Sequence, residues 1–154
     1  MADLRHYLSI RVGQQWYGVD VNHIVEALHM LALAEVPAAE KNILGLMTLR
    51  DQVVPVIDLR QYFGIAEPAY HLTTPIVAVH LCSRREQQTM AGLVVDEVDN
   101  VETVSADVLA AYDGPPIAQV SGVVRTGERL LLLLDLDAVS QTLYANPAAA
   151  AAQQ

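Results

Sequence analysis

The residues whose side chains could carry out chemistry are a serine, five histidines and two repeated aspartates. Ser121 lies next to a glycine, but it falls on an expected strand and lacks the Gly-x-Ser-x-Gly pattern of a nucleophilic serine. No two histidines have the short helical or strand spacing of metal ligands. Asp58 and Asp135 each follow an apolar stretch and precede a leucine, which is typical of a helix N-cap rather than of a catalytic carboxylate pair. These residues therefore do not converge on a catalytic centre.

The remaining candidates are an acidic cluster and a single cysteine. Asp96, Glu97 and Asp99 lack the alternating carboxylates and the glycine of a calcium loop, so we interpret them as a solvated connection. Cys82 has no partner for an internal disulfide, and its apolar neighbours favour a small buried side chain. The sequence also lacks glycine-rich phosphate-binding loops. We predict no enzymatic activity, no cofactor and no bound metal.

The elements that carry the two aspartates occur twice. The segments Gly45–Asp58 and Gly122–Asp135 each run from glycine through an apolar stretch, a polar turn and a second apolar stretch to Asp-Leu, and both glycines precede their aspartate by 13 residues. A weaker pair begins at Gly18 and Gly92. Two similar β-modules within 154 residues indicate a protein that holds partners together rather than an active-site scaffold.

Composition excludes several classes of partner. The formal charge of −9 opposes binding to nucleic acid and to anionic membrane surfaces. No apolar run reaches the roughly 18 residues of a membrane-spanning helix, and the N-terminus does not resemble a signal peptide. We therefore expect a cytoplasmic protein without membrane insertion.

Period-two patterns predict about ten strands with three or four short helical pieces. Pro55 lies inside an expected strand and predicts an edge position or a bulge there. Asp58 is the expected N-cap of a short helix with Gln61 in the capping-box position, and Asp20 is the expected cap of a helical turn. The expected strands cover 6–12, 16–19, 21–28 after that turn, 43–49, 53–57, 76–82, 89–95, 100–104, 120–125 and 129–134; the expected helices cover 59–63 and the residues after 135, and 31–41 is an expected loop.

The segment from Asn42 to Arg60 is the most specific part of the chain. It resembles the signature Gly-x-x-Asn-Leu-Arg-Gly-x-x-x-Pro-x-x-Asp-Leu-Arg of the CheW-like family, the coupling adaptors of bacterial chemosensory arrays. Three further segments resemble the family in the same order: Tyr17–Glu26, the segment from Gly92, and Gly122–Leu136. The resemblance covers roughly residues 5–144. Thr48 and Asp51 depart from the family, which has Asn and Gly at these two positions.

The resemblance implies an all-β fold of two intertwined five-stranded SH3-like β-barrels, with a C-terminal helix that packs back on the first. The expected CheW-like domain covers 5–144. Within it, the first barrel covers about 5–58 plus the C-terminal segment and the second about 70–134. Residues 145–154 form an expected flexible, Ala-rich tail.

The resemblance also implies two partners. They are the helical cytoplasmic tip of a methyl-accepting chemotaxis receptor and the regulatory domain of a chemosensory histidine kinase, so that the protein would be recruited to membrane-bound receptor arrays. Weak self-association stays open, because the barrel contact is pseudo-symmetric. The pathway also stays open between flagellar chemotaxis and pilus-based motility or surface sensing. A small-ligand-binding β-barrel is the alternative from another class.

The candidate receptor- and kinase-binding residues come from two of the matched segments. Arg50 is expected at a hairpin tip, where it would contact the receptor, with Thr48 and Leu49 beside it. Gly45 would allow a receptor helix to approach closely, so Arg50→Ala and Gly45→Asp are expected to weaken receptor binding without loss of the fold. Ile24 would line the groove that receives this receptor helix, and Glu26 would contact the kinase or the receptor.

Overall fold

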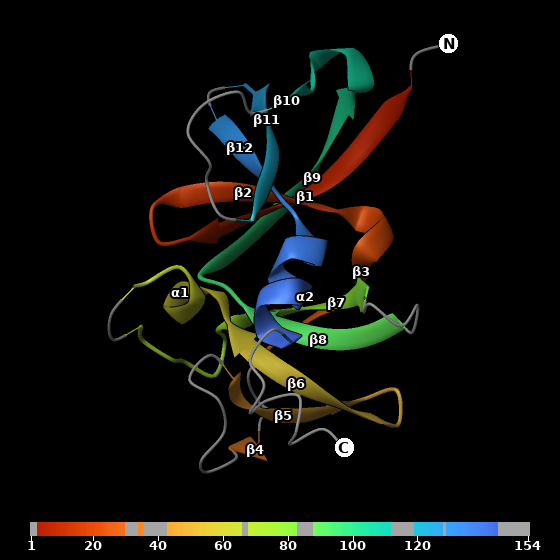
Figure 1. Cartoon of the computed structure of the whole chain (residues 1–154). Coiled ribbons are helices and arrows are strands. Elements are labelled where there is room, and N and C mark those ends of the chain that lie inside the picture. Colours follow the sequence, from red (N-terminus) through yellow and green to blue (C-terminus); the bar gives the residue numbers. More distant parts are fainter. Residues whose placement is uncertain are drawn as a thin grey trace.

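The computed structural model describes residues 3–29, 34–35, 43–65, 68–82, 88–111, 119–127 and 129–144. Two curved sheets stack on each other, with the short helices α1 and α2 at their junction (Figure 1). We call them sheet A and sheet B. Each contains five longer strands and one strand of two residues, which confirms the expected all-β fold with short helices. No helix in the described ranges is long and apolar enough to cross a membrane.

Sheet A has the strand order β10-β11-β12-β2-β1-β9, and sheet B has the order β4-β5-β6-β8-β7-β3. The strands of sheet A are β1 (Leu4–Val12), β2 (Gln15–Asp20), β9 (Glu97–Ser105), β10 (Ala110–Ala111), β11 (Val120–Thr126) and β12 (Arg129–Leu134). The strands of sheet B are β3 (Ile24–His29), β4 (Ala34–Glu35), β5 (Ile43–Leu49), β6 (Gln52–Asp58), β7 (Pro75–Cys82) and β8 (Gln88–Val94). The helices are η1 (Val21–His23), α1 (Leu59–Tyr62), η3 (Ala106–Val108) and α2 (Leu136–Tyr144).

The two sheets are intertwined. Each combines an antiparallel hairpin from one half of the chain, β1–β2 or β7–β8, with four strands from the other half. The expected first barrel, about 5–58 plus the C-terminal segment, and the expected second, about 70–134, differ from these sheets: sheet A takes strands from 4–20 and 97–134, and sheet B from 24–58 and 75–94. The exchange buries each hairpin against strands that lie far from it in sequence, which a division by sequence position cannot anticipate.

The repeat in the sequence reappears in the register of the two sheets. Among the described strands, two pairings are parallel, and they place Val56 opposite Gly92 in sheet B and Leu133 opposite Gly18 in sheet A. A Cβ on Gly92 would lie 2.9 Å from Ile76 Cγ2, and one on Gly18 would lie 3.1 Å from Leu133 Cδ2. Neither parallel pairing therefore leaves free space for a side chain on its glycine. This explains why Gly18 and Gly92 begin the weaker repeat.

The buried apolar side chains of the described residues form three clusters rather than one core. Met47, Leu49 and Val54 belong to a cluster that we call the inner cluster of sheet B, and Val124 and Leu131 belong to the corresponding cluster of sheet A. The third and largest cluster lies between the sheets and contains strand residues of both together with residues of α2. The helix α2 packs back on the body of the fold, against β7 of sheet B and the cluster between the sheets.

Three local details differ from the sequence expectations. Strand β6 lies between β5 and β8 rather than at an edge, and the register irregularity falls on β5 between Ile43 and Gly45 instead of at Pro55. Pairing with β8 begins only at Val56, so the strand tolerates the missing proline N–H. The side chain of Gln61 donates to the Tyr70 hydroxyl, and it does not accept from the backbone N–H of Asp58 as a capping box requires. Ala34 and Glu35, expected in a loop, pair with β5.

Candidate functional site

The hairpin β5–β6 turns through two residues, Arg50 and Asp51. Leu49 pairs with Gln52, so the expected three-residue turn contains only two. Both turn residues have left-handed backbones, with φ of 49° at Arg50 and 64° at Asp51. This is the geometry that two-residue hairpins favour, although Asn-Gly is the preferred sequence for it. Gly127, which occupies the position of Arg50 in the hairpin β11–β12, has the same conformation, with φ of 59°.

Both turn side chains project from sheet B into solvent. Arg50 and Asp51 are exposed, and neither forms a hydrogen bond or an ion pair with the part of the chain that the structure describes. The turn lies at the end of sheet B that points away from α1 (Figure 1). An arginine held on a rigid two-residue turn is available for a partner without first breaking internal contacts.

The outer face of the hairpin presents an apolar strip beside Arg50. Thr48 pairs with Val53, and Leu46 pairs with Pro55, so all four point away from the inner cluster of sheet B. Thr48 is exposed, and the Val53 side chain is 69% exposed. The sequence reasoning missed Val53, although its place opposite Thr48 across the turn would have revealed it. We call Leu46, Thr48, Arg50, Val53 and Pro55 the hairpin face.

Two of the predicted site residues on β5 are buried. Leu49 is 5% exposed and belongs to the inner cluster of sheet B, because strand side chains alternate between the two faces. Gly45 is also buried, between Glu35 of β4 and Val56 of β6. An aspartate there would place a carboxylate inside the sheet, so Gly45→Asp cannot be expected to leave the fold intact.

The other two predicted residues lie on the edge strand at the opposite end of sheet B. Ile24 packs against the cluster between the sheets, and Glu26 is half-buried opposite Ala78 on β7. The structure therefore joins Thr48, Leu49 and Arg50 on one hairpin but does not pair this hairpin with Ile24 or Glu26. Val25 of β3 packs against the same inner cluster of sheet B to which Leu49 of β5 belongs.

A buried ionic network lies where α1 begins. The Arg60 guanidinium donates to Asp58 Oδ1 at 3.0 Å from Nε and to Asp58 Oδ2 at 3.2 Å from Nη2. Its Nη1 donates to Asp96 Oδ1 at 3.2 Å and to the Ala69 carbonyl at 2.7 Å. Asp58 also caps α1 by accepting from the Arg60 backbone N–H. The Asp58 side chain is fully buried and that of Arg60 is 4% exposed, so each compensates the other's charge.

The same network ties sheet B to sheet A. Asp96 follows β8, and its Oδ2 accepts from the Gly13 backbone N–H in the turn between β1 and β2 at 2.7 Å. Burial alone lowers the pKa of Arg60, but its hydrogen bonds and charge interactions with Asp58 and Asp96 outweigh this and raise the pKa. Burial, and then the hydrogen bond to Asp58, raise the pKa of Tyr70 to about 12. Arg60 is therefore a structural cation that fixes the joint between the sheets.

The residues first considered for chemistry have structural roles or no shared site. Asp58 Oδ1 and Asp135 Oδ1 accept from the N–H groups of Arg60 and Ala138, so both aspartates cap helices as predicted. Asp20 caps η1 in the same way. The Ser121 hydroxyl contacts the Leu133 carbonyl at 3.5 Å. Within the described ranges, no group of three or more His, Cys, Asp or Glu residues could hold a metal ion. The Cys82 side chain and the tail 145–154 lie outside the described part.

Comparison with known proteins gives a consistent result over nearly the whole chain. A family model described as a CheW-like domain matches residues 6–143. The chemotaxis protein CheW of Rhizobium meliloti is 28% identical over 139 residues, which cover 88% of this chain and 86% of that protein. The chemotaxis protein CheW of Klebsiella aerogenes is 26% identical over 139 residues, with 86% and 80% covered.

The fold also agrees with a solved structure. The scaffolding protein TtCheW from Thermoanaerobacter tengcongensis superposes with a TM-score of 0.73 at 24% identity, and the match covers 87% of this chain and 89% of that one. At this level of identity the likeness concerns the fold alone.

Proposed function

The chain belongs to the CheW-like domain family, and on this premise we propose that it is a non-catalytic adaptor that couples the helical tip of a methyl-accepting chemoreceptor to the regulatory domain of a chemosensory histidine kinase. The match of residues 6–143 to the family carries this proposal. In this proposal the protein works in the cytoplasm, where it is recruited to receptor arrays. The output of such an adaptor is a difference in contact free energy between kinase-on and kinase-off arrangements, transmitted through a rigid body.

The hairpin face is the surface that we assign to the receptor. It combines an exposed guanidinium at Arg50 with the exposed apolar side chain of Val53 on one rigid hairpin. A cation beside an apolar strip suits an amphipathic helix that presents apolar anchors with a carboxylate next to them. The receptor tip is expected to be helical, so the two surfaces agree in shape and chemistry.

The buried positions contribute to this surface indirectly. Leu49 and Gly45 set the curvature and position of β5 from inside the sheet, while Thr48 and Arg50 make the contact. Glu26, on the edge strand β3, lies at the other end of sheet B, so a partner that it contacts would approach from a different side.

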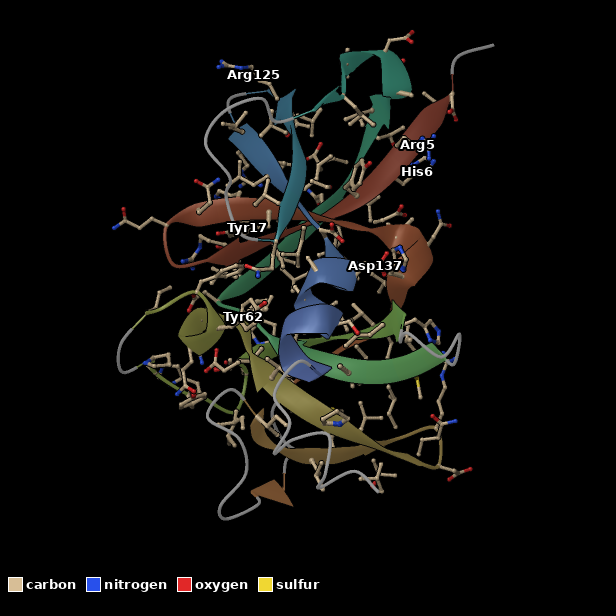
Figure 2. All side chains as sticks on the ribbon, in the orientation of Figure 1. Arg5, His6, Tyr17, Tyr62, Arg125 and Asp137 are labelled. Atoms are coloured by element: carbon tan, nitrogen blue, oxygen red, sulfur yellow. The ribbon has the colours of Figure 1, made fainter. Side chains whose placement is uncertain are left out.

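A binding experiment with a matched control tests the receptor contact. Arg50→Ala should weaken binding to the purified cytoplasmic fragment of a receptor from the same organism about tenfold, the loss of about 1.4 kcal/mol typical of one interface arginine. Arg125→Ala is the control. Arg125 is an exposed arginine on the equivalent hairpin of sheet A, so its replacement should leave the receptor affinity unchanged (Figure 2).

A second experiment concerns β3. Glu26→Ala, measured against receptor and kinase fragments separately, shows which of the two partners contacts this strand.

The outcomes separate the surface from the function. Equal affinity of Arg50→Ala and the unmodified protein, at unchanged melting temperature, would move the receptor contact elsewhere on the molecule. If the unmodified protein binds neither the receptor fragment nor the kinase regulatory domain, the adaptor proposal itself is wrong.

A further inference from the structure

The turn between β5 and β6 holds two adjacent residues in a backbone conformation that glycine adopts at the lowest cost. Arg50 and Asp51 both have left-handed backbones, with φ of 49° and 64°. In the equivalent turn between β11 and β12, glycine fills the position of Arg50, at Gly127. Strained residues that a fold retains often mark a functional site, so this turn invites the question of what its two side chains do.

No contact inside the described chain explains the aspartate. In a turn, an aspartate commonly offsets the cost of its backbone conformation by accepting hydrogen bonds from nearby backbone N–H groups. Among the described residues, Asp51 accepts no hydrogen bond, and it forms no ion pair with the neighbouring Arg50. Its side chain is exposed. The carboxylate is therefore available to a partner without the loss of an internal contact.

The turn presents two opposite charges at a fixed spacing. The Cα atoms of Arg50 and Asp51 are neighbours in the chain, about 3.8 Å apart, and the pair of Leu49 and Gln52 closes the hairpin beneath them. Val53, whose side chain is exposed, follows Asp51 by two residues on the same hairpin. A partner that covers Val53 and reaches Arg50 therefore also meets the carboxylate of Asp51.

We infer that Asp51 determines which receptors the hairpin face accepts, by pairing with a Lys or Arg of the receptor helix one turn away from the carboxylate that Arg50 binds. Residues three or four positions apart on a helix have Cβ atoms about 5–6 Å apart, a spacing that two adjacent turn side chains can span. A receptor with a carboxylate in place of that cation would be repelled, so one residue attracts one set of receptors and rejects another. The inference rests on the proposed function and specifies the chemistry of the receptor surface.

The first test removes only the charge. Asp51→Asn keeps the shape of the side chain and tolerates a left-handed backbone. It should weaken binding to the purified cytoplasmic fragment of a receptor from the same organism about fivefold at about 0.1 M salt. At about 1 M salt the difference should shrink to less than about twofold, because salt screens exposed charges. Asp107→Asn is the control, since it makes the same change in net charge at an exposed carboxylate on η3 and should leave affinity unchanged.

The second variant separates a structural role from a role in recognition. Glycine adopts the φ of 64° with less strain, so Asp51→Gly should unfold at no lower urea concentration than the unmodified protein. It should nevertheless bind the receptor fragment as weakly as Asp51→Asn. If Asp51 only shaped the turn, Asp51→Gly would bind as well as the unmodified protein or better.

An exchange of charges identifies the receptor residue. Each Lys and Arg of the receptor tip is changed to Glu in turn, and the affinity of every fragment is measured for the unmodified protein and for Asp51→Lys. One fragment should bind the unmodified protein at least about tenfold more weakly than the unchanged fragment does, and should recover most of this loss with Asp51→Lys, because the two changes restore an opposite-charge pair.

The outcomes distinguish this inference from the proposed function. Equal affinities of Asp51→Asn and Asp107→Asn, or a set of fragments none of which Asp51→Lys rescues, would overturn the inference and leave the adaptor proposal standing, since the unmodified protein still binds the receptor. If the unmodified protein binds no receptor fragment, the proposed function is wrong and the inference fails with it.

Discussion

Removal of the Arg60 guanidinium should cost far more stability than removal of any exposed arginine. The Arg60 side chain is 4% exposed. Among the described residues, it is the one ionic partner of the fully buried Asp58. Breaking a buried pair by deleting one partner leaves an uncompensated buried charge and typically costs about 3–5 kcal/mol. We expect Arg60→Ala to lower the free energy of unfolding by that amount, a large part of the 5–15 kcal/mol typical of such a domain.

The measurement is urea unfolding at pH 7, followed by circular dichroism and by the fluorescence of the single tryptophan, Trp16. Since the network also ties β8 to the turn between β1 and β2, sheets A and B should lose structure together in the unmodified protein. Arg5→Ala is the matched control, because the Arg5–Asp3 pair is 51% and 67% exposed and should contribute no more than about 0.5 kcal/mol.

A double-mutant cycle isolates the pair. Asp58→Asn keeps a residue that caps helices well but removes the buried charge. The double variant should be more stable than the sum of the two single effects implies, by about 1–3 kcal/mol. An Arg60→Ala loss below about 1 kcal/mol, or additive single effects, would show that the buried pair does not hold the joint.

Four further predictions concern single residues. Asp51→Gly should raise the urea midpoint by the equivalent of about 0.5–1 kcal/mol, because glycine adopts a backbone φ of 64° with less steric strain than aspartate. A lower midpoint would contradict the turn geometry. Gly92→Ala should destabilise by about 1–3 kcal/mol, since the added methyl would lie 2.9 Å from Ile76 Cγ2, and unchanged melting would refute this close packing. Gly45→Asp should abolish folding rather than partner binding alone, and a well-dispersed NMR spectrum would contradict it. The pKa of Tyr70 is raised to about 12 from an ordinary value near 10, so its neutral form stabilises the fold below pH 10 and this stability is lost as the pH rises towards 12. Tyr70→Phe should remove this part of the alkaline loss of stability. The melting temperature of the variant should therefore fall less between pH 9 and pH 12 than that of the unmodified protein.

Local patterns in the sequence predicted the strands well. The alternation in β1 and β2 and the two long hairpins that end at Asp58 and Asp135 correspond to strands within a few residues. The two caps were also predictable, because an aspartate between an apolar strand and a short helix satisfies backbone N–H groups that have no other partner. The prediction of an edge strand from Pro55 was wrong because the pairing of β6 with β8 begins at Val56, one residue after the proline. This register is set by the tertiary structure.

The candidate site was predictable only in part. Arg50 at a hairpin tip follows from the polar turn between two apolar stretches. The burial of Gly45 and Leu49 and the exposure of Val53 depend on which face of the hairpin curls inward, and this is set by contacts with β4, β7 and β8. The structural role of Arg60 was hidden for the same reason, because Asp96 lies 36 residues away along the chain.

The sequence by itself determined the duplicated β-modules, their hairpins and capped helices, and the family, because these follow from local periodicity and from the order of short motifs. The tertiary structure decided that the halves exchange hairpins and that Arg60 joins Asp58 to Asp96 at the junction of the two sheets. Both outcomes depend on residues that lie far apart along the chain and meet only in the folded interior, where a buried charge needs an opposite charge beside it.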